Sequence, residues 1–369
     1  MKSIPPINNC LTDELRMDLK RYMTYKSSVF SIKSSVSITL GFKIHNIWQI
    51  QDIENRSFIR KHKFYDGEEK ELVVEKITRL NGSTFGNVYR IESRNQRLFL
   101  KIKRHIFPFH NWDMLLEHLL YRKLSLDGFA VPISIAIDLS HTRINADYSI
   151  DSFIEGDNFL FAFKKHGPRI IENLGKSLAY LHKNKGKKFG YLDAQILIDT
   201  GQFIGSCNSW WNFISSNYQN DLVALTTNSL LSQSNLEFMN AAFLKFKELK
   251  IEENTLLHGD LFYKNIIASQ YKIYFVDFED ALIGDPIFDI ALFFSFFEEY
   301  GYLPNFFEGY SGSDVVEDNE ARRFWFYVLR ISVSDLARSV RWKDWGKSNK
   351  ERIMRNISRS IKELRKYSF

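Results

Sequence analysis

Short runs of apolar residues occur between residues 73 and 102, and their length predicts strands. Val73–Leu80, Asn87–Glu92 and Leu98–Ile102 are each five to eight residues long and contain β-branched, aromatic or leucine residues. Asn81–Gly86 lies between the first two runs and consists mainly of small and polar residues, which favours a loop. This part of the chain is therefore expected to form a small sheet.

After Pro168 the apolar residues recur at helical spacing, and proline is favoured in the first turn of a helix. The helix is expected to end at Gly186. Two further helices are expected near Trp210–Leu225 and Asn235–Leu249, and an apolar helix over Ile290–Phe297. The apolar residues that set the helical period after Pro168 are Ile170, Ile171, Leu174, Leu178 and Leu181.

The first part of the chain, up to about Gly67, matches no assignable pattern. Thr12–Tyr25 is expected to form a short helix, because Asp13 and Glu14 would complement the dipole of its first turn. Residues 1–70 are interpreted as an extension whose role the sequence does not identify. A half-buried strand is predicted from the alternation of Val36, Ile38, Leu40, Phe42 and Ile44.

Length and composition favour a globular protein of about two domains. The chain has 369 residues, of which 44% are hydrophobic and 15% aromatic. Cys10 and Cys207 cannot build a disulfide framework or a zinc site. The first ten residues lack the apolar segment of a signal peptide, and the apolar run Ile290–Phe297 is too short to span a membrane. A cytoplasmic protein without membrane contact is expected.

Charge is unevenly distributed along the chain, although the net charge is only +6. Residues 298–320 contain seven acidic residues without one Lys or Arg, and the chain becomes basic from Arg322 onward. A basic tail can bind nucleic acid or acidic lipid. Its arginines alternate with apolar positions at helical spacing, which favours a solvated helix face, so a nucleic-acid partner is disfavoured. These arginines include Arg338, Arg341, Arg352, Arg355 and Arg359.

The stretch Leu256–Ala291 carries the clearest chemistry. His258-Gly259-Asp260 follows two leucines, and Asn265 stands five residues after Asp260. This is the D-x-x-x-x-N spacing of a kinase catalytic loop. Phosphoryl transfer requires a carboxylate to orient the attacking hydroxyl and oxygen ligands for Mg²⁺. Asp260 is the candidate base, and Asn265 is a candidate metal ligand.

Asp277 supplies the second candidate metal ligand. Ile266 and Ile267 begin a predicted hairpin, and its second arm, Ile273–Val276, is apolar and ends immediately before Asp277. Asp277-Phe278-Glu279 takes the place of the kinase D-F-G motif, where a carboxylate bridges Mg²⁺ to the phosphates. Each of these motifs alone could be a turn or a solvated acidic loop. Their occurrence together and in order argues against that simpler interpretation.

With Gly284-Asp285-Pro286 and Asp289-Ile290-Ala291, the segment resembles the aminoglycoside phosphotransferase and choline kinase group of kinase-like enzymes. The resemblance implies an α+β, bilobal protein-kinase-like fold, with a small antiparallel sheet and one main helix in the N-lobe and a larger, mainly helical C-lobe. It places the nucleotide lobe at 71–153 and the catalytic and acceptor lobe at 154–369. It implies ATP and Mg²⁺ as cofactors. It also makes Asp289 a buried brace for the catalytic loop, although an N-cap role would fit Asp289 too.

Lys101 is the candidate phosphate ligand of the small lobe, because it lies in the predicted strand Leu98–Ile102, where a buried charge requires a partner. The resemblance implies that Lys101 holds the α- and β-phosphates and pairs with a helix glutamate, for which Glu117 is the candidate. Considered singly, an exposed strand lysine and a solvated helix glutamate would explain these two residues equally well.

Other nucleotide contacts are expected in two places. Gly82 and Gly86 flank a loop where backbone N–H groups can approach phosphate oxygens, although a plain hairpin would have the same sequence. The segment around Tyr148–Gly156 resembles the hinge between kinase lobes, where the backbone binds adenine. Asp151 and Phe153 are the candidates there.

Departures from protein kinases favour a small acceptor. Gly259 replaces the arginine of H-R-D, Phe262 stands where Ser/Thr kinases carry a lysine, and no A-P-E motif follows Asp277. The predicted reaction is transfer of the γ-phosphate of ATP to a hydroxyl of an aminoglycoside-, choline- or sugar-like molecule. The acidic stretch 298–320 would suit a cationic acceptor, but a solvated loop explains it equally. A kinase acting on a macromolecule and a catalytically silent nucleotide-binding module remain alternatives.

Overall fold

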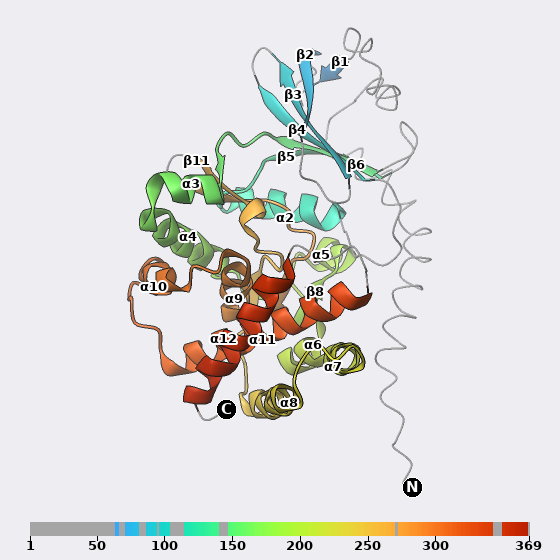
Figure 1. The fold of residues 1–369 in the computed structure, drawn as a ribbon. Coiled ribbons are helices and arrows are strands. Elements are labelled where there is room, and N and C mark those ends of the chain that lie inside the picture. Colours follow the sequence, from blue (N-terminus) through green and yellow to red (C-terminus); the bar gives the residue numbers. More distant parts are fainter. Residues whose placement is uncertain are drawn as a thin grey trace. The chain divides into compact units, whose positions relative to one another are not determined.

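The computed structural model describes residues 63–65, 71–80, 86–93, 96–103, 114–139, 147–269, 272–341 and 349–367 (Figure 1). The expected elements before Gly67, a helix at 12–25 and a strand at 36–44, lie outside these residues. The chain divides into two compact units. The first contains the described residues within 1–110 and 132–153, and the second those within 111–131 and 154–369.

The first unit contains a six-stranded antiparallel sheet in the order β1-β2-β3-β4-β6-β5. Strand β4 shows why these residues form a sheet, because Leu98, Leu100 and Ile102 are buried in alternation along it. The three strands predicted between residues 73 and 102 are confirmed within two residues at each end. The strands are β1 (Lys63–Tyr65), β2 (Glu71–Leu80), β3 (Gly86–Ser93), β4 (Arg97–Lys103), β5 (Ser134–Asp138) and β6 (Asp147–Ser152).

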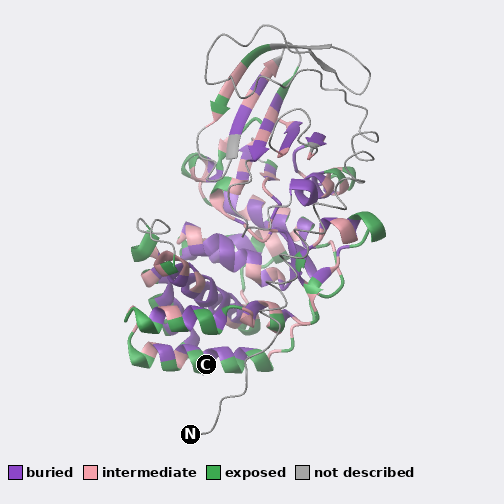
Figure 2. Ribbon diagram, turned by 90° about the vertical axis from the view of Figure 1, so that its right-hand side faces the viewer, coloured by how far each residue is buried: buried purple, intermediate pink, exposed green. Residues whose placement is uncertain are grey.

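The second unit is mainly helical, and its helices have buried and exposed faces (Figure 2). The predicted helix after Pro168 is confirmed as α4 (Pro168–Leu181), although it ends at Leu181, with His182 as its C-cap, and does not extend to Gly186. Its five period-setting apolar residues are all buried. The other helices are α2 (Met114–Leu126), α3 (Phe159–His166), α5 (Ala194–Thr200), α6 (Trp210–Ser215), α7 (Tyr218–Thr227), α8 (Gln233–Glu248), α9 (Pro286–Phe297), α10 (Leu303–Ser311), α11 (Asp318–Arg341) and α12 (Lys350–Lys366).

Helix α9 begins earlier than the apolar run predicted. Asp285 is its N-cap and accepts a hydrogen bond from the N–H of Ile287 at 3.0 Å, and Pro286 occupies the first turn. Asp289 therefore lies inside the helix and does not cap it. The carboxylate of Asp289 is left to interact with another segment of the chain.

Two small sheets of the second unit support the segment from Leu256 to Ala291. One has the order β10-β13-β8-β9 and the other β12-β11-β7. The predicted hairpin is confirmed as β11 paired with β12. Across the described residues, no helix is long and apolar enough to cross a membrane. The strands are β7 (Asp157–Asn158), β8 (Phe189–Leu192), β9 (Gly205–Cys207), β10 (Thr255–Leu257), β11 (Ile266–Ser269), β12 (Lys272–Phe275) and β13 (Leu282–Gly284).

Candidate active site

The loop that carries Asp260 begins at the end of the buried strand β10. Gly259 follows with φ +81°, a conformation that residues with a side chain rarely adopt. A Cβ on Gly259 would also overlap the carbonyl oxygen of Asp280. Glycine is therefore required between His258 and Asp260, because the backbone turns sharply against a neighbouring segment.

Asp289 holds this turn through hydrogen bonds to its backbone. Its carboxylate accepts the backbone N–H of His258 at 2.7 Å through Oδ2 and that of Gly259 at 3.1 Å through Oδ1. Asp289 and His258 are both fully buried, so these bonds form away from water. The role of brace expected for Asp289 is confirmed.

A second layer of polar residues holds Asp289. His182, which caps the end of α4, lies with Nε2 3.3 Å from Oδ2 of Asp289 and Nδ1 2.8 Å from the hydroxyl of Tyr310. Tyr310 is on α10, which packs so closely on α4 that a side chain on Gly175 would overlap the α10 backbone. The two helices thus deliver the groups that position Asp289.

Asp260 and Asn265 are in direct contact. The side-chain amide of Asn265 donates to the carboxylate Oδ2 of Asp260 at 2.8 Å and to its backbone carbonyl at 2.9 Å. Both amide protons are thereby directed at Asp260, and the amide oxygen of Asn265 is turned away from it. That oxygen has the chemistry of a ligand for a hard cation.

Asp277 is joined to the same loop through the backbone. The N–H of Val276 donates to the carbonyl of Asn265 at 3.0 Å, and Nε2 of His258 donates to the carbonyl of Val276 at 2.9 Å. Because a carbonyl only accepts, the proton of a neutral His258 lies on Nε2, and Nδ1 accepts the N–H of Asp260 at 3.3 Å. His258 therefore ties the segment of Asp260 to the segment of Asp277.

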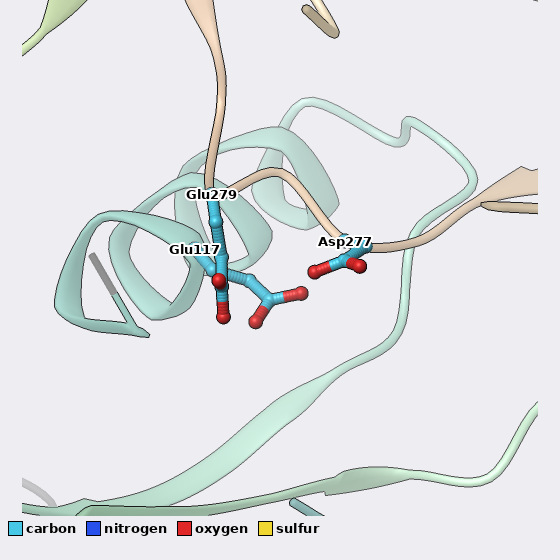
Figure 3. A group of neighbouring side chains, drawn as sticks. All are labelled: Glu117, Asp277 and Glu279. Carbon is cyan, nitrogen blue, oxygen red and sulfur yellow. The ribbon is translucent and has the colours of Figure 1, made fainter. Parts of the chain in front are cut away.

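The carboxylate of Asp277 lies close to two others. Oxygen atoms of Glu117, Asp277 and Glu279 lie within 4.8 Å of one another, and Figure 3 shows the side chains pointing toward a common centre. Glu117 is buried on α2, and Glu279 is buried two residues after Asp277. Carboxylate oxygens are the ligands that Mg²⁺ prefers, so this donor set fits a divalent cation.

Burial and neighbouring charge affect the candidate base. Burial raises the pKa of Asp260, and the nearby negative charge of Asp277 raises it further. His258, the hydrogen bond from Asn265 and Arg338 act in the opposite direction. A cation bound by Asp277 would offset the repulsion between the two carboxylates and favour the ionised form of Asp260.

The remaining predicted residues lie mostly in the first unit. Lys101 is half-buried on β4, opposite Val88 and Ser149, and Gly86 is the first residue of β3. Gly82 lies outside the described residues. The pairing of Lys101 with Glu117 and the phosphate contacts of the two glycines stay predictions.

The hinge residues are also in the first unit. Asp151 is buried and accepts hydrogen bonds from the hydroxyls of Ser134 at 2.7 Å and Ser149 at 3.3 Å. The N–H of Phe153 donates to the carbonyl of Arg97 at 3.0 Å. These bonds hold the sheet together, and the adenine contact assigned to this segment stays a prediction.

The sequence assigned no role to Tyr191, an aromatic residue near the candidate base Asp260. Tyr191 pairs with Leu282 across β8 and β13, and β13 pairs on its other side with β10, beside which Asp280 lies against Gly259. Its side chain is 42% exposed and packs edge-on against Phe213 at 5.1 Å between ring centroids. Desolvation of the phenol raises its pKa, and the negative charges of Asp280 and Asp260 raise it further, while the positive charges of Arg338 and Arg330 lower it.

Comparison with known families agrees with this geometry. The model of the phosphotransferase enzyme family, designated APH, matches residues 76–325, more than half of the chain. The protein belongs to this family. The matched range contains the described strands β3 and β4 and the complete segment from His258 to Asp289.

Individual relatives are more distant. A probable aminoglycoside 3'-phosphotransferase of Lactococcus lactis subsp. lactis is 26% identical over 156 residues, which are 39% of this chain and 51% of the relative. A LicA homologue of Mycoplasma capricolum subsp. capricolum is 29% identical over 126 residues, which are 34% of this chain and 52% of the relative. The chain thus spans about half the length of the curated relatives it matches.

Solved structures share the fold. One is a thermostable mutant of aminoglycoside phosphotransferase APH(4)-Ia in ternary complex with AMP-PNP and hygromycin B. It is 14% identical with a TM-score of 0.61, and the match covers 86% of this chain and 98% of the solved chain. A putative fructosamine-3-kinase from Haemophilus somnus 129PT is 18% identical with a TM-score of 0.53, covering 80% and 92%. The predicted kinase-like α+β fold is confirmed.

Proposed function

We propose that this protein transfers the γ-phosphate of ATP to a hydroxyl group of a small molecule. Asp260 orients the hydroxyl and accepts its proton. Lys101 holds the phosphates and pairs with Glu117. The observation that supports this proposal most strongly is the hydrogen bond from Asn265 to Oδ2 of Asp260, which fixes the carboxylate next to the segment of Asp277.

Asn265 and Asp277 would hold Mg²⁺, which when bound neutralises phosphate charge during transfer. The donor set supports this assignment, because the amide oxygen of Asn265 is turned away from Asp260 and the carboxylate of Asp277 lies among two others. Glu279, which the sequence motif contains without an assigned role, belongs to the same carboxylate cluster. The site suits a hard cation and offers no sulfur ligand within that cluster.

The acceptor side is expected at Tyr191 and Phe213, because Tyr191 presents an exposed ring beside the segment of Asp260. Aromatic faces bind sugars and alkylated amines through apolar and cation–π contacts. Structures of related fold were solved with hygromycin B or with AMP-PNP, Ca²⁺ and Ami. The acidic stretch gives little support to a cationic acceptor, because its first residue, Glu298, forms a bidentate ion pair with Arg355.

The test is transfer of label from γ-labelled ATP in the presence of Mg²⁺ to a panel of aminoglycosides, choline, sugars and nucleosides. The Asp260→Asn variant serves as the blank. Label in the small-molecule fraction that is absent from the blank supports the proposal. Label only in protein contradicts it and favours a kinase of macromolecules, and ATP binding without transfer to any acceptor favours a silent binding module.

A further inference from the structure

The hydroxyl of Tyr121 lies between the helix that carries Glu117 and the backbone of Asp277. Tyr121 stands four residues after Glu117 on α2, so both side chains lie on one face of the helix. Its hydroxyl oxygen is 2.7 Å from Oε1 of Glu117 and 2.8 Å from the backbone nitrogen of Asp277. These three residues all belong to the second unit.

Both hydrogen bonds have a defined direction. A backbone N–H can only donate, so the oxygen of Tyr121 accepts a hydrogen bond from the backbone N–H of Asp277. The single hydroxyl proton of Tyr121 is then donated to Glu117. A hydroxyl that donates to an ionised carboxylate forms a strong, charge-assisted bond. Tyr121 therefore links the two carboxylate residues in one fixed arrangement.

The backbone of Asp277 needs such support. Its φ is +70°, in the left-handed region that residues with a side chain adopt at a cost. The peptide that precedes Asp277 is held by His258, which donates to the carbonyl of Val276, and by Tyr121, which accepts the N–H of Asp277. These contacts determine where the carboxylate of Asp277 points.

The aromatic ring of Tyr121 contributes separately. It packs edge-on against Phe278 with 6.1 Å between the ring centroids, and Phe278 lies 4.5 Å from the ring of His258. A phenylalanine at position 121 would keep this packing and remove only the hydroxyl. The contribution of the hydroxyl can therefore be measured without disturbing the core.

We propose that Tyr121 is a positioning residue for the metal site: its hydroxyl aligns the Asp277 carboxylate with Glu117 and thereby sets the affinity for the metal–nucleotide complex. This inference rests on the proposed function, because it assigns Mg²⁺ to Asp277. Figure 3 shows that Glu117 and Asp277 point toward the same centre, where a small displacement of either carboxylate would alter the spacing of the donor oxygens. Mg²⁺ demands near-ideal geometry and is sensitive to such changes.

The experiment compares the binding of a fluorescent, non-hydrolysable ATP analogue with and without Mg²⁺ in the full chain. Mg²⁺ should increase the affinity of the wild type for the analogue by a certain factor, and in Tyr121→Phe this factor should be about tenfold smaller, the effect expected when a buried hydrogen bond is lost. Its affinity without metal should equal that of the wild type. Tyr300→Phe is the matched control, because the buried hydroxyl of Tyr300 bonds to Asn356 at 2.7 Å on other helices. Its metal-dependent gain should be unchanged.

Three results would overturn the inference. If Tyr121→Phe keeps the full metal-dependent gain while Asp277→Asn loses it, the metal assignment stands and Tyr121 has no positioning role. If Tyr121→Phe and Tyr300→Phe lose the gain equally, the effect is a general loosening of the core. If the wild type shows no metal-dependent gain, the proposed function fails together with the inference.

Discussion

The carbonyl oxygen of Asp280 occupies the space that a side chain on Gly259 would need. The two segments touch because β10 and β13 are paired, which brings the residues beside these strands together. A substitution at Gly259 would therefore displace the backbone of the loop that carries Asp260.

Gly259→Ala is expected to reduce turnover by at least about tenfold, since misplacement of a catalytic group by an ångström costs one to two orders of magnitude. It should also lower the melting temperature, because neither the positive φ nor the backbone overlap can be relieved cheaply. Gly301→Ala is the control: no atom lies within 4 Å of a Cβ there, and both properties should stay at wild-type values. Wild-type turnover in Gly259→Ala would refute the steric explanation.

Asp289→Asn tests the brace beneath the loop. The variant keeps the size of the side chain, but an amide offers one acceptor oxygen to the two N–H groups of His258 and Gly259. The unsatisfied group should cost about 1–3 kcal/mol of unfolding free energy. We expect kcat to fall more than the nucleotide affinity, because the loop that is disturbed carries the base. A change confined to nucleotide affinity would contradict this role.

A buried ion pair supports the N-terminus of α9. Arg323 donates to Oδ1 of Asp285 at 2.9 Å, and the hydroxyl of Tyr327 donates to Oδ2 at 2.6 Å. Arg323→Met would leave the buried carboxylate without its cation, and the free energy of unfolding should fall by about 3–5 kcal/mol. Denaturant titration measures this loss. Arg355→Met, which breaks the exposed pair with Glu298, should leave stability almost unchanged. Equal losses of unfolding free energy in the two variants would show that burial of the ion pair does not determine its contribution to stability.

The stability of the second unit should depend on pH through His118. Burial, followed by the charge of Arg122, lowers the pKa of this α2 histidine to about 4 from 6.5. The unfolded chain therefore binds more protons than the folded chain between these values, and stability falls as the pH drops. Between pH 7 and pH 5 the loss should be about 2 kcal/mol. His118→Leu should remove this part of the pH dependence, as measured by denaturant titration at both values. An unchanged pH dependence in the variant would contradict the assignment.

Residues close in sequence were the ones that sequence patterns placed correctly. The apolar hairpin predicted that Asp277 would follow a buried strand, and the structure has β11 paired with β12 just before it. The short apolar run at 98–102 predicted β4, and the helical period after Pro168 predicted α4, because both patterns reflect local backbone geometry.

Contacts between distant segments could not be derived in this way. Tyr121 and Asp277 are 156 positions apart, and their hydrogen bond depends on where the fold places α2 relative to the segment after β12. Tyr191 lies beside the loop of Asp260 only because β8 pairs with β13. The start of α9 was predicted too late for a related reason. The apolar run begins only at Ile290, whereas the helix begins after its N-cap Asp285, and Asp285 is also held by an ion pair with the distant, buried Arg323.

The central claim is that Asp260 acts in catalysis and not in nucleotide binding. The direct test measures turnover and Mg²⁺-dependent nucleotide affinity of Asp260→Asn in the same preparation. Asparagine retains an oxygen that can accept the hydrogen bond from Asn265. We therefore predict nucleotide affinity within about twofold of the wild type and turnover lower by at least about two orders of magnitude, the contribution expected of a positioned general base. Wild-type turnover in this variant would contradict the account.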